Sequence, residues 1–136
     1  MSGDGSGNLH PYVQVVGPFY DEQGAASVLE VTYNEVGAMI ENGSLIACQL
    51  ADPDRTWVLP AWQFDRFGGV VAATADVWRV LIDEGRADDL RWSAALWMCS
   101  ANPDLDEMTA VDWLSEGRSV EPVLNSARTT MSQWQA

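Results

Sequence analysis

The stretch that decides the fold is GAASVLEVTYNEVGAMIENGSLIA, residues 24–47. It opens with an apolar-periodic run behind two acidic residues, which is typical of a short helix with acids at the positive end of its dipole. Thr32 then stands three residues before Glu35, the spacing of a capping box, and this predicts the start of a second helix. Asn42 and Gly43 predict its end. Two helices joined by a tight turn are therefore expected in the first half.

Two short strands are expected directly after these helices. The segments 45–50 and 56–59 are rich in apolar residues, and the sequence Ala-Asp-Pro-Asp between them has turn chemistry. For such a helix pair to present its second helix outward, Leu29 and Ile40 must be buried together and Glu35 must be exposed.

The second half of the chain is expected to be helical. Its apolar periodicity is interrupted by single glycines and by the pair Asn102-Pro103. Ser119 is expected to cap the last helix, whose apolar stripe begins at Val120 and includes Met131 and Trp134. The expected helices are 74–84, 90–100, 109–114 and 120–134.

These elements predict a mainly α protein with a small β-wing, in which a winged helix-turn-helix leads into a helical C-terminal lobe. The glycine pair after Arg66-Phe67 marks the expected boundary. The expected divisions are a flexible N-terminal tail at 1–16, a winged helix-turn-helix-like domain at 17–66 and a partner-binding lobe at 67–136.

The charge of the chain restricts its partners. Seven arginines, no lysine and twenty acidic residues give a net charge of −13. Residues 1–65 hold one basic and nine acidic residues (−8), and residues 66–136 hold six and eleven (−5), which together give −13. This charge repels nucleic-acid phosphates and anionic lipid and attracts basic protein surfaces. A role in solubility alone is an equally good interpretation.

Few residues suit catalysis or metal binding. The single histidine, His10, lies in the expected tail, where no triad or metal geometry would hold it. Cys48 and Cys99 are expected to be buried, reduced small hydrophobes. No run of 18 apolar residues and no signal-peptide pattern is present. We therefore expect a cytoplasmic binding protein with no cofactor, no metal and no catalytic residues, and not an enzyme.

The seven tryptophans are many for a chain of 136 residues. Most are expected to be half-buried packing residues, each with an indole N–H that needs a partner. One or two could instead form the centre of an interface. Trp113 and Trp134, in the last two expected helices, are the candidates.

The first half resembles a winged helix-turn-helix of the excisionase type on the residues quoted above. Leu59 to Phe64 resembles a stretch of actinobacterial and phage proteins that join this motif to an antitoxin-like domain. The second half resembles that domain, the Xre/MbcA/ParS toxin-binding type, in Trp92–Trp97, Asn102-Pro103-x-Leu105, Thr109–Leu114, Gly117 and Val120–Ala127. It departs from the pattern at Ala110, where proline is usual, and at Asp106, where glycine is common.

The resemblance implies a protein partner. In the antitoxin family the partner is a RES-domain toxin that degrades NAD, and the C-terminal end of the antitoxin blocks the toxin's active site. A RES-domain toxin or another basic protein is therefore the expected partner. The partner-binding residues that the resemblance implies are Asp112, Trp113, Arg118, Trp134, Gln135 and Ala136. Met131 is a further candidate, because methionine is a residue type that is enriched at interfaces.

Two other functions remain open at this stage. One is a DNA-binding transcription regulator that uses Thr32, Tyr33, Asn34 and Arg55. The expected recognition helix contains Glu35 and Glu41 but no arginine or lysine, although phosphate and base contacts normally need cations. A homodimer would gather Arg55 with Arg66. The other function is an acidic inhibitor that occupies a basic, nucleic-acid-binding surface.

Overall fold

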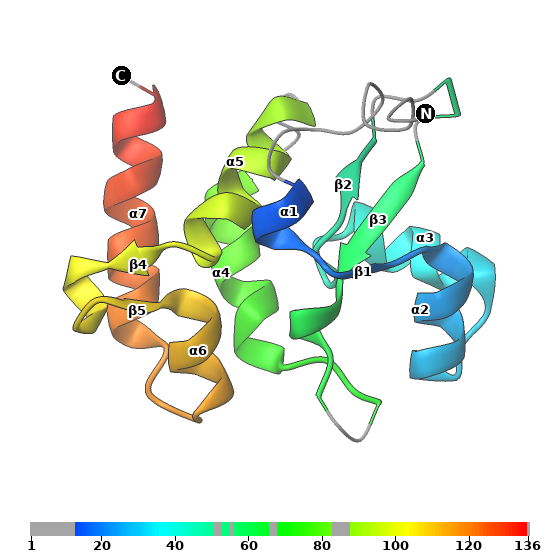
Figure 1. Cartoon of the computed structure of the whole chain (residues 1–136), viewed down its shortest axis with the longest axis horizontal. Coiled ribbons are helices and arrows are strands. Elements are labelled where there is room, and N and C mark those ends of the chain that lie inside the picture. Colours follow the sequence, from blue (N-terminus) through cyan, green and yellow to red (C-terminus); the bar gives the residue numbers. More distant parts are fainter. Residues whose placement is uncertain (1–12, 51–52, 55, 66–67, 83–87, 136) are drawn as a thin grey trace.

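The structure is a computed structural model that describes residues 13–50, 53–54, 56–65, 68–82 and 88–135 (Figure 1). The described chain is mainly helical and has two small antiparallel sheets. The helices are α1 (Val13–Val16), α2 (Glu22–Leu29), α3 (Tyr33–Glu41), α4 (Ala72–Ile82), α5 (Asp88–Met98), α6 (Ala110–Ser115) and α7 (Glu121–Gln135). The strands are β1 (Phe19–Tyr20), β2 (Cys48–Gln49), β3 (Trp57–Pro60), β4 (Ala101–Asn102) and β5 (Met108–Thr109). Short 3-10 turns are η2 (Ala61–Gln63) and η3 (Pro103–Leu105).

The two expected helices of the first half are present as α2 and α3. The predicted capping box is confirmed, because the Glu35 N–H donates to Thr32 Oγ1 at 3.1 Å and the Thr32 N–H donates to Glu35 Oε1 at 2.8 Å. Ile40 is 1% exposed, and the half-buried Leu29 packs against the same apolar cluster. Glu35 is exposed. Ile40 is therefore buried and Glu35 exposed as expected, whereas Leu29 is only half-buried at the edge of the cluster.

A three-stranded antiparallel sheet lies beside α2 and α3, in the order β1-β3-β2. The strand expected at 45–50 is reduced to Cys48–Gln49, and β1 was not expected. The reason for the short strand is Gln63 in η2. Its Oε1 accepts from the Ile46 N–H at 2.8 Å, and its Nε2 donates to the Ile46 carbonyl oxygen at 2.8 Å. A side chain therefore satisfies the backbone groups that a neighbouring strand would otherwise bind.

Residues 45–48, the last of which begins β2, separate two apolar cores. Leu45 and Ala47 belong to a cluster with α2 and α3, whereas Ile46 and Cys48 belong to a larger cluster centred on Trp78. All four residues of this segment have no exposed surface. Successive side chains of an extended segment point to opposite sides, so one short stretch of chain serves both cores.

The second half is helical as expected, and each helix begins and ends within two residues of the predicted bounds. The helices α4 and α7 pack against each other (Figure 1). Val123 and Ala127 of the predicted α7 stripe are fully buried. The small sheet β4–β5, which pairs Asn102 with Met108, was not expected from the sequence.

The predicted flexible tail at 1–16 is wrong for its last four residues. These form α1, and Val16 has no exposed surface. The Val16 carbonyl oxygen accepts a hydrogen bond of 2.9 Å from the Trp62 indole N–H, which ties α1 to the residues that follow β3. Residues 1–12, including His10, lie outside the described residues.

Candidate functional site

The outward face of α3 is the first candidate surface. Thr32, Tyr33 and Asn34, which were predicted for DNA contact, are all exposed at the start of this helix. Tyr33 is 51% exposed, which is unusual for a large aromatic side chain in this molecule. Arg55, predicted for the wing, lies outside the described residues. The structure therefore brings three of the four predicted residues together on one surface.

This surface is acidic. The Tyr33 hydroxyl donates to Glu22 Oε1 at 3.0 Å, and this hydrogen bond, with the charge of Glu22, raises the pKa of Tyr33. Hydrogen bonds from the Thr32 backbone and then its side chain lower the pKa of Glu35. The carboxylate of Glu35 is therefore ionised at neutral pH. A cleft of about 210 Å³ at the start of α2 and α3 is lined by Asp21, Glu22, Gln23, Tyr33 and Thr56.

The four arginines in the described part of the chain all contact groups of the protein itself. The Arg91 guanidinium lies 5.0 Å from the centre of the Trp57 ring and donates to the Ala47 carbonyl oxygen at 3.2 Å. Arg128 donates to Asn125 Oδ1 at 3.1 Å. The other two, Arg79 and Arg118, are described below. None lies on α2 or α3.

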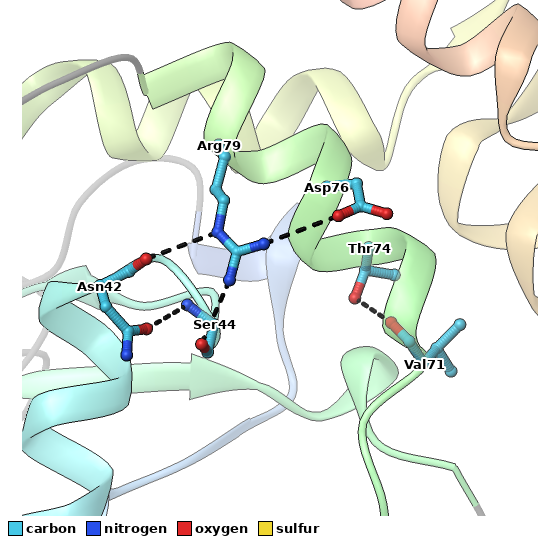
Figure 2. A network of polar contacts seen from close by, with 6 residues as sticks. All are labelled: Asn42, Ser44, Val71, Thr74, Asp76 and Arg79. Atoms are coloured by element: carbon cyan, nitrogen blue, oxygen red, sulfur yellow. Dashed lines mark hydrogen bonds and ion pairs between the residues drawn. The ribbon is translucent and has the colours of Figure 1, made fainter.

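Arg79 joins α4 to the end of α3 (Figure 2). Its Nε donates to the Asn42 carbonyl oxygen at 3.4 Å, and its Nη2 donates to Ser44 Oγ at 3.2 Å. Its Nη1 lies 3.6 Å from Asp76 Oδ1. Gly43 between the two partners has φ +82°, and a Cβ there would approach Arg79 Cγ to 2.9 Å. A cation from the second half of the chain thus occupies the negative end of the α3 dipole.

A second candidate surface surrounds α6. Trp113 is half-buried, and its indole N–H donates to the Ser119 carbonyl oxygen at 2.7 Å. The Arg118 guanidinium lies 4.7 Å from the centre of the Trp113 ring and its Nε lies 2.9 Å from Glu116 Oε1. Asp112 is exposed on the same helix. Three of the predicted partner-binding residues are therefore grouped here.

The remaining predicted partner-binding residues are at the end of α7. Met131 is only 7% exposed and belongs to the core, because α7 turns it toward the molecule as part of its apolar stripe. Met131 was predicted to bind a partner, which requires an exposed side chain, so this prediction is wrong. The backbone of Trp134 and Gln135 continues α7, and Ala136 lies outside the described residues.

A polar groove of about 360 Å³, which was not predicted from the sequence, lies between the end of α5, η3 and α7. The α7 residues that line this groove are spaced i, i+3, i+4 and i+7 and therefore share one face of the helix. This stripe of uncharged polar residues is the feature of the sequence from which the groove could have been predicted. The lining residues are Trp97, Ser100, Ala101, Asn102, Pro103, Asp104, Ser126, Thr129, Thr130 and Gln133.

The described residues contain no group of three or more histidine, cysteine or acidic side chains that could hold a metal ion. Burial raises the pKa of the Cys48 thiol to about 12 and that of Cys99 to about 11. Both thiols are thus protonated, poor nucleophiles at neutral pH. In the described part of the chain, no helix has the length and apolar character needed to cross a membrane.

Comparisons with known proteins bear on the fold. No protein-family model matches the chain, and no curated protein matches it. Among solved structures, the chain is similar to the NMR structure of Rv2175c, with a TM-score of 0.67 and 24% sequence identity over 90% of this chain and 84% of that one. The likeness shows that the two chains share a fold across both halves.

Proposed function

We propose that this chain is a regulatory binding protein, not an enzyme, whose partner is a protein with a basic surface. In this proposal α2, the turn and α3 are a helix-turn-helix, and β2–β3 is its wing. The observation that carries the proposal is the charge of α3. Its exposed face bears Glu35 and Glu41 with the exposed Tyr33, and the helix contains no cation.

The chemistry of this face supports a protein partner over DNA. Arginine and lysine side chains neutralise the phosphates that a DNA-binding protein contacts, and the resulting release of counterions supplies most of the non-specific affinity. The carboxylates of Glu35 and Glu41 on α3 would repel the phosphates of DNA. An exposed tyrosine ring flanked by Glu22 suits a lysine or arginine side chain, because the ring face and the carboxylate both attract cations.

The test is capture of a partner from native lysate by the full chain, with identification of the captured protein. The variant combines Tyr33→Ala with Glu41→Gln, which leaves the capping box intact. The matched control is Glu121→Gln, an exposed glutamate at the start of α7. We expect a basic protein that the wild type and the control retain and the variant loses. Equal retention by all three proteins would remove α3 from the interface.

A second proposal follows from the grouping around α6. Trp113, Asp112 and Arg118 support an antitoxin-like role in which the C-terminal lobe docks on a RES-domain toxin. Its test is truncation after Ser132, which keeps the buried Met131. If the last residues occupy a toxin active site, the truncated chain keeps its Tm and loses the co-expressed toxin. Retention of the toxin by the truncated chain would exclude this role for the chain end.

DNA binding is the remaining alternative, and a mobility-shift titration with the region upstream of its gene separates it from the other two. We expect no sequence-specific retention below about 1 µM at about 150 mM salt, because non-specific complexes in this regime have dissociation constants of about 10⁻⁴–10⁻⁶ M. Tighter, specific retention would establish a DNA-binding regulator.

A further inference from the structure

The groove between α5, η3 and α7 has a lining whose polar groups are only partly used. Ser126 is 7% exposed, and its Oγ accepts a hydrogen bond of 3.0 Å from Asn102 Nδ2. The hydroxyl proton of Ser126 is still available to a ligand. Among the described residues, the side chains of Thr130 and Gln133 have no hydrogen-bond partner. The groove therefore offers several donors and acceptors from fixed positions on one helix.

The charge of the groove has one sign. Asp104 is its single acidic lining residue, and in the described part of the chain no cation pairs with this side chain. The Asp104 backbone N–H donates to Asn102 Oδ1 at 2.9 Å, which fixes the residue at the start of η3. Trp97 adds a half-buried indole ring to the wall. The lining thus combines a carboxylate, an aromatic ring and neutral hydroxyl and amide groups.

This combination fits a guanidinium group. A guanidinium is planar, carries five N–H donors, forms paired hydrogen bonds with carboxylates and stacks on aromatic faces. An anionic ligand would meet the Asp104 carboxylate and no cation. A purely apolar ligand would leave the hydroxyl and amide groups of α7 without partners. We propose that the groove is a docking pocket for an arginine side chain of a protein partner.

The helix α7, which lines one side of the pocket, lies at the opposite end of the molecule from α2 and α3 (Figure 1). The pocket therefore forms a contact that is separate from the acidic face of α3. The inference rests on the proposed function only in taking the partner to be a basic protein. Binding of an isolated arginine derivative tests the pocket without that partner.

The experiment is a titration of the ¹⁵N-labelled full chain with Nα-acetylarginine amide, followed by ¹H–¹⁵N NMR. The matched probe is Nα-acetylcitrulline amide, which has nearly the same shape and no charge. We expect saturable shifts of the Trp97 indole signal and of the Thr130 and Gln133 backbone amides, with a dissociation constant of about 1 mM, as is usual for a fragment of this size. The citrulline probe should bind at least about tenfold more weakly, since it has lost the charge-assisted contact.

Two variants locate the binding. Asp104→Asn removes the carboxylate and should abolish the preference for arginine over citrulline. Asp106→Asn makes the same charge change on an exposed residue outside the lining, at a positive φ of 56° that asparagine tolerates, and should keep the preference. Equal binding of the two probes to the wild type, or an unchanged preference in Asp104→Asn, would overturn the proposal.

The same titration separates this inference from the proposed function. The variant with Tyr33→Ala and Glu41→Gln should bind acetylarginine amide as the wild type does, even when it loses its protein partner. If partner capture depends on α3 while the arginine preference is absent, only the pocket is refuted. If the preference is present while capture ignores α3, only the role of that helix is refuted.

Discussion

Replacing Gln63 with leucine should destabilise the whole molecule, because this buried side chain links η2 to the segment between the two cores. Gln63 has no exposed surface. It makes three hydrogen bonds: it accepts from the Ile46 N–H and donates to the carbonyl oxygens of Ile46 and Pro60, at 2.8, 2.8 and 3.1 Å. Leucine has a similar volume but can make none of these bonds.

The cost follows from the groups that lose their partner. Ile46 is fully buried, so water cannot replace Gln63 at its N–H or its carbonyl oxygen. Each buried polar group left unsatisfied costs about 1–3 kcal/mol, and the apolar leucine side chain recovers part of this. We expect the free energy of unfolding to fall by about 2–4 kcal/mol. For a chain of this size, that corresponds to a Tm lower by about 6–12 °C.

Thermal unfolding followed by circular dichroism measures the effect. Gln23→Leu, on the exposed side of α2, is the matched control and should change stability by less than about 0.5 kcal/mol. Gln63→Glu keeps the shape and one acceptor but loses the donor, so it should also destabilise the protein. A Tm of Gln63→Leu equal to that of the control would show that these hydrogen bonds do not hold the segment.

Three further predictions concern smaller features. Thr32→Ala should cost about 1 kcal/mol in chemical denaturation, since it removes half of the capping box. The pKa of Glu35 is lowered in the folded state, so ionised Glu35 stabilises the fold at a pH above the ordinary glutamate pKa. This stabilisation is lost as the pH falls through the folded pKa. The loss of stability caused by Thr32→Ala should therefore be smaller in acid than at neutral pH. Gly43→Ala should lower the Tm by several degrees, because alanine at φ +82° is strained and its Cβ would collide with a side chain of α4. Cys48 is buried, whereas Cys99, also expected to be buried, is only partly so. Both should react with a thiol reagent at pH 8 far more slowly in the folded protein than in denaturant, since their pKa values are raised to about 12 and 11. Rapid modification of the folded chain would contradict this.

Local signals allowed much of the helical structure to be predicted. Thr32 with Glu35, and Thr109 before α6, are caps whose partners lie within three residues, so the sequence alone contains both ends of each interaction. Six tryptophans have described side chains: four of these are half-buried, as predicted for most of them, and Trp78 and Trp92 are buried. Apolar periodicity and helix capping depend on residues that are close together in the sequence, so they could be recognised without knowledge of the tertiary structure.

The features that were missed depend on residues far apart in the chain. The strand at 45–50 was predicted too long because Gln63, 17 residues after Ile46, takes the backbone bonds of that residue. The groove needs Asn102 beside Ser126, a pair 24 residues apart. No periodicity in a single sequence contains such pairings. The burial of Met131 was implied by its place in the α7 stripe, whereas its residue type, which is enriched at interfaces, favoured a surface role.

The placement of α3 depends on the second half of the chain as well as the first. Arg79 of α4 binds Asn42 and Ser44, directly after the helix. Gln63 holds Ile46, and the side chains on either side of that residue enter the core beneath α3. If α3 were packed against α2 alone, its orientation relative to the rest of the molecule could change at little cost. The contacts of Arg79 and Gln63 instead join the C-terminal end of α3 to the larger core. The acidic face of α3 is therefore presented in a fixed orientation, and a macromolecular partner would meet it without having to order it first.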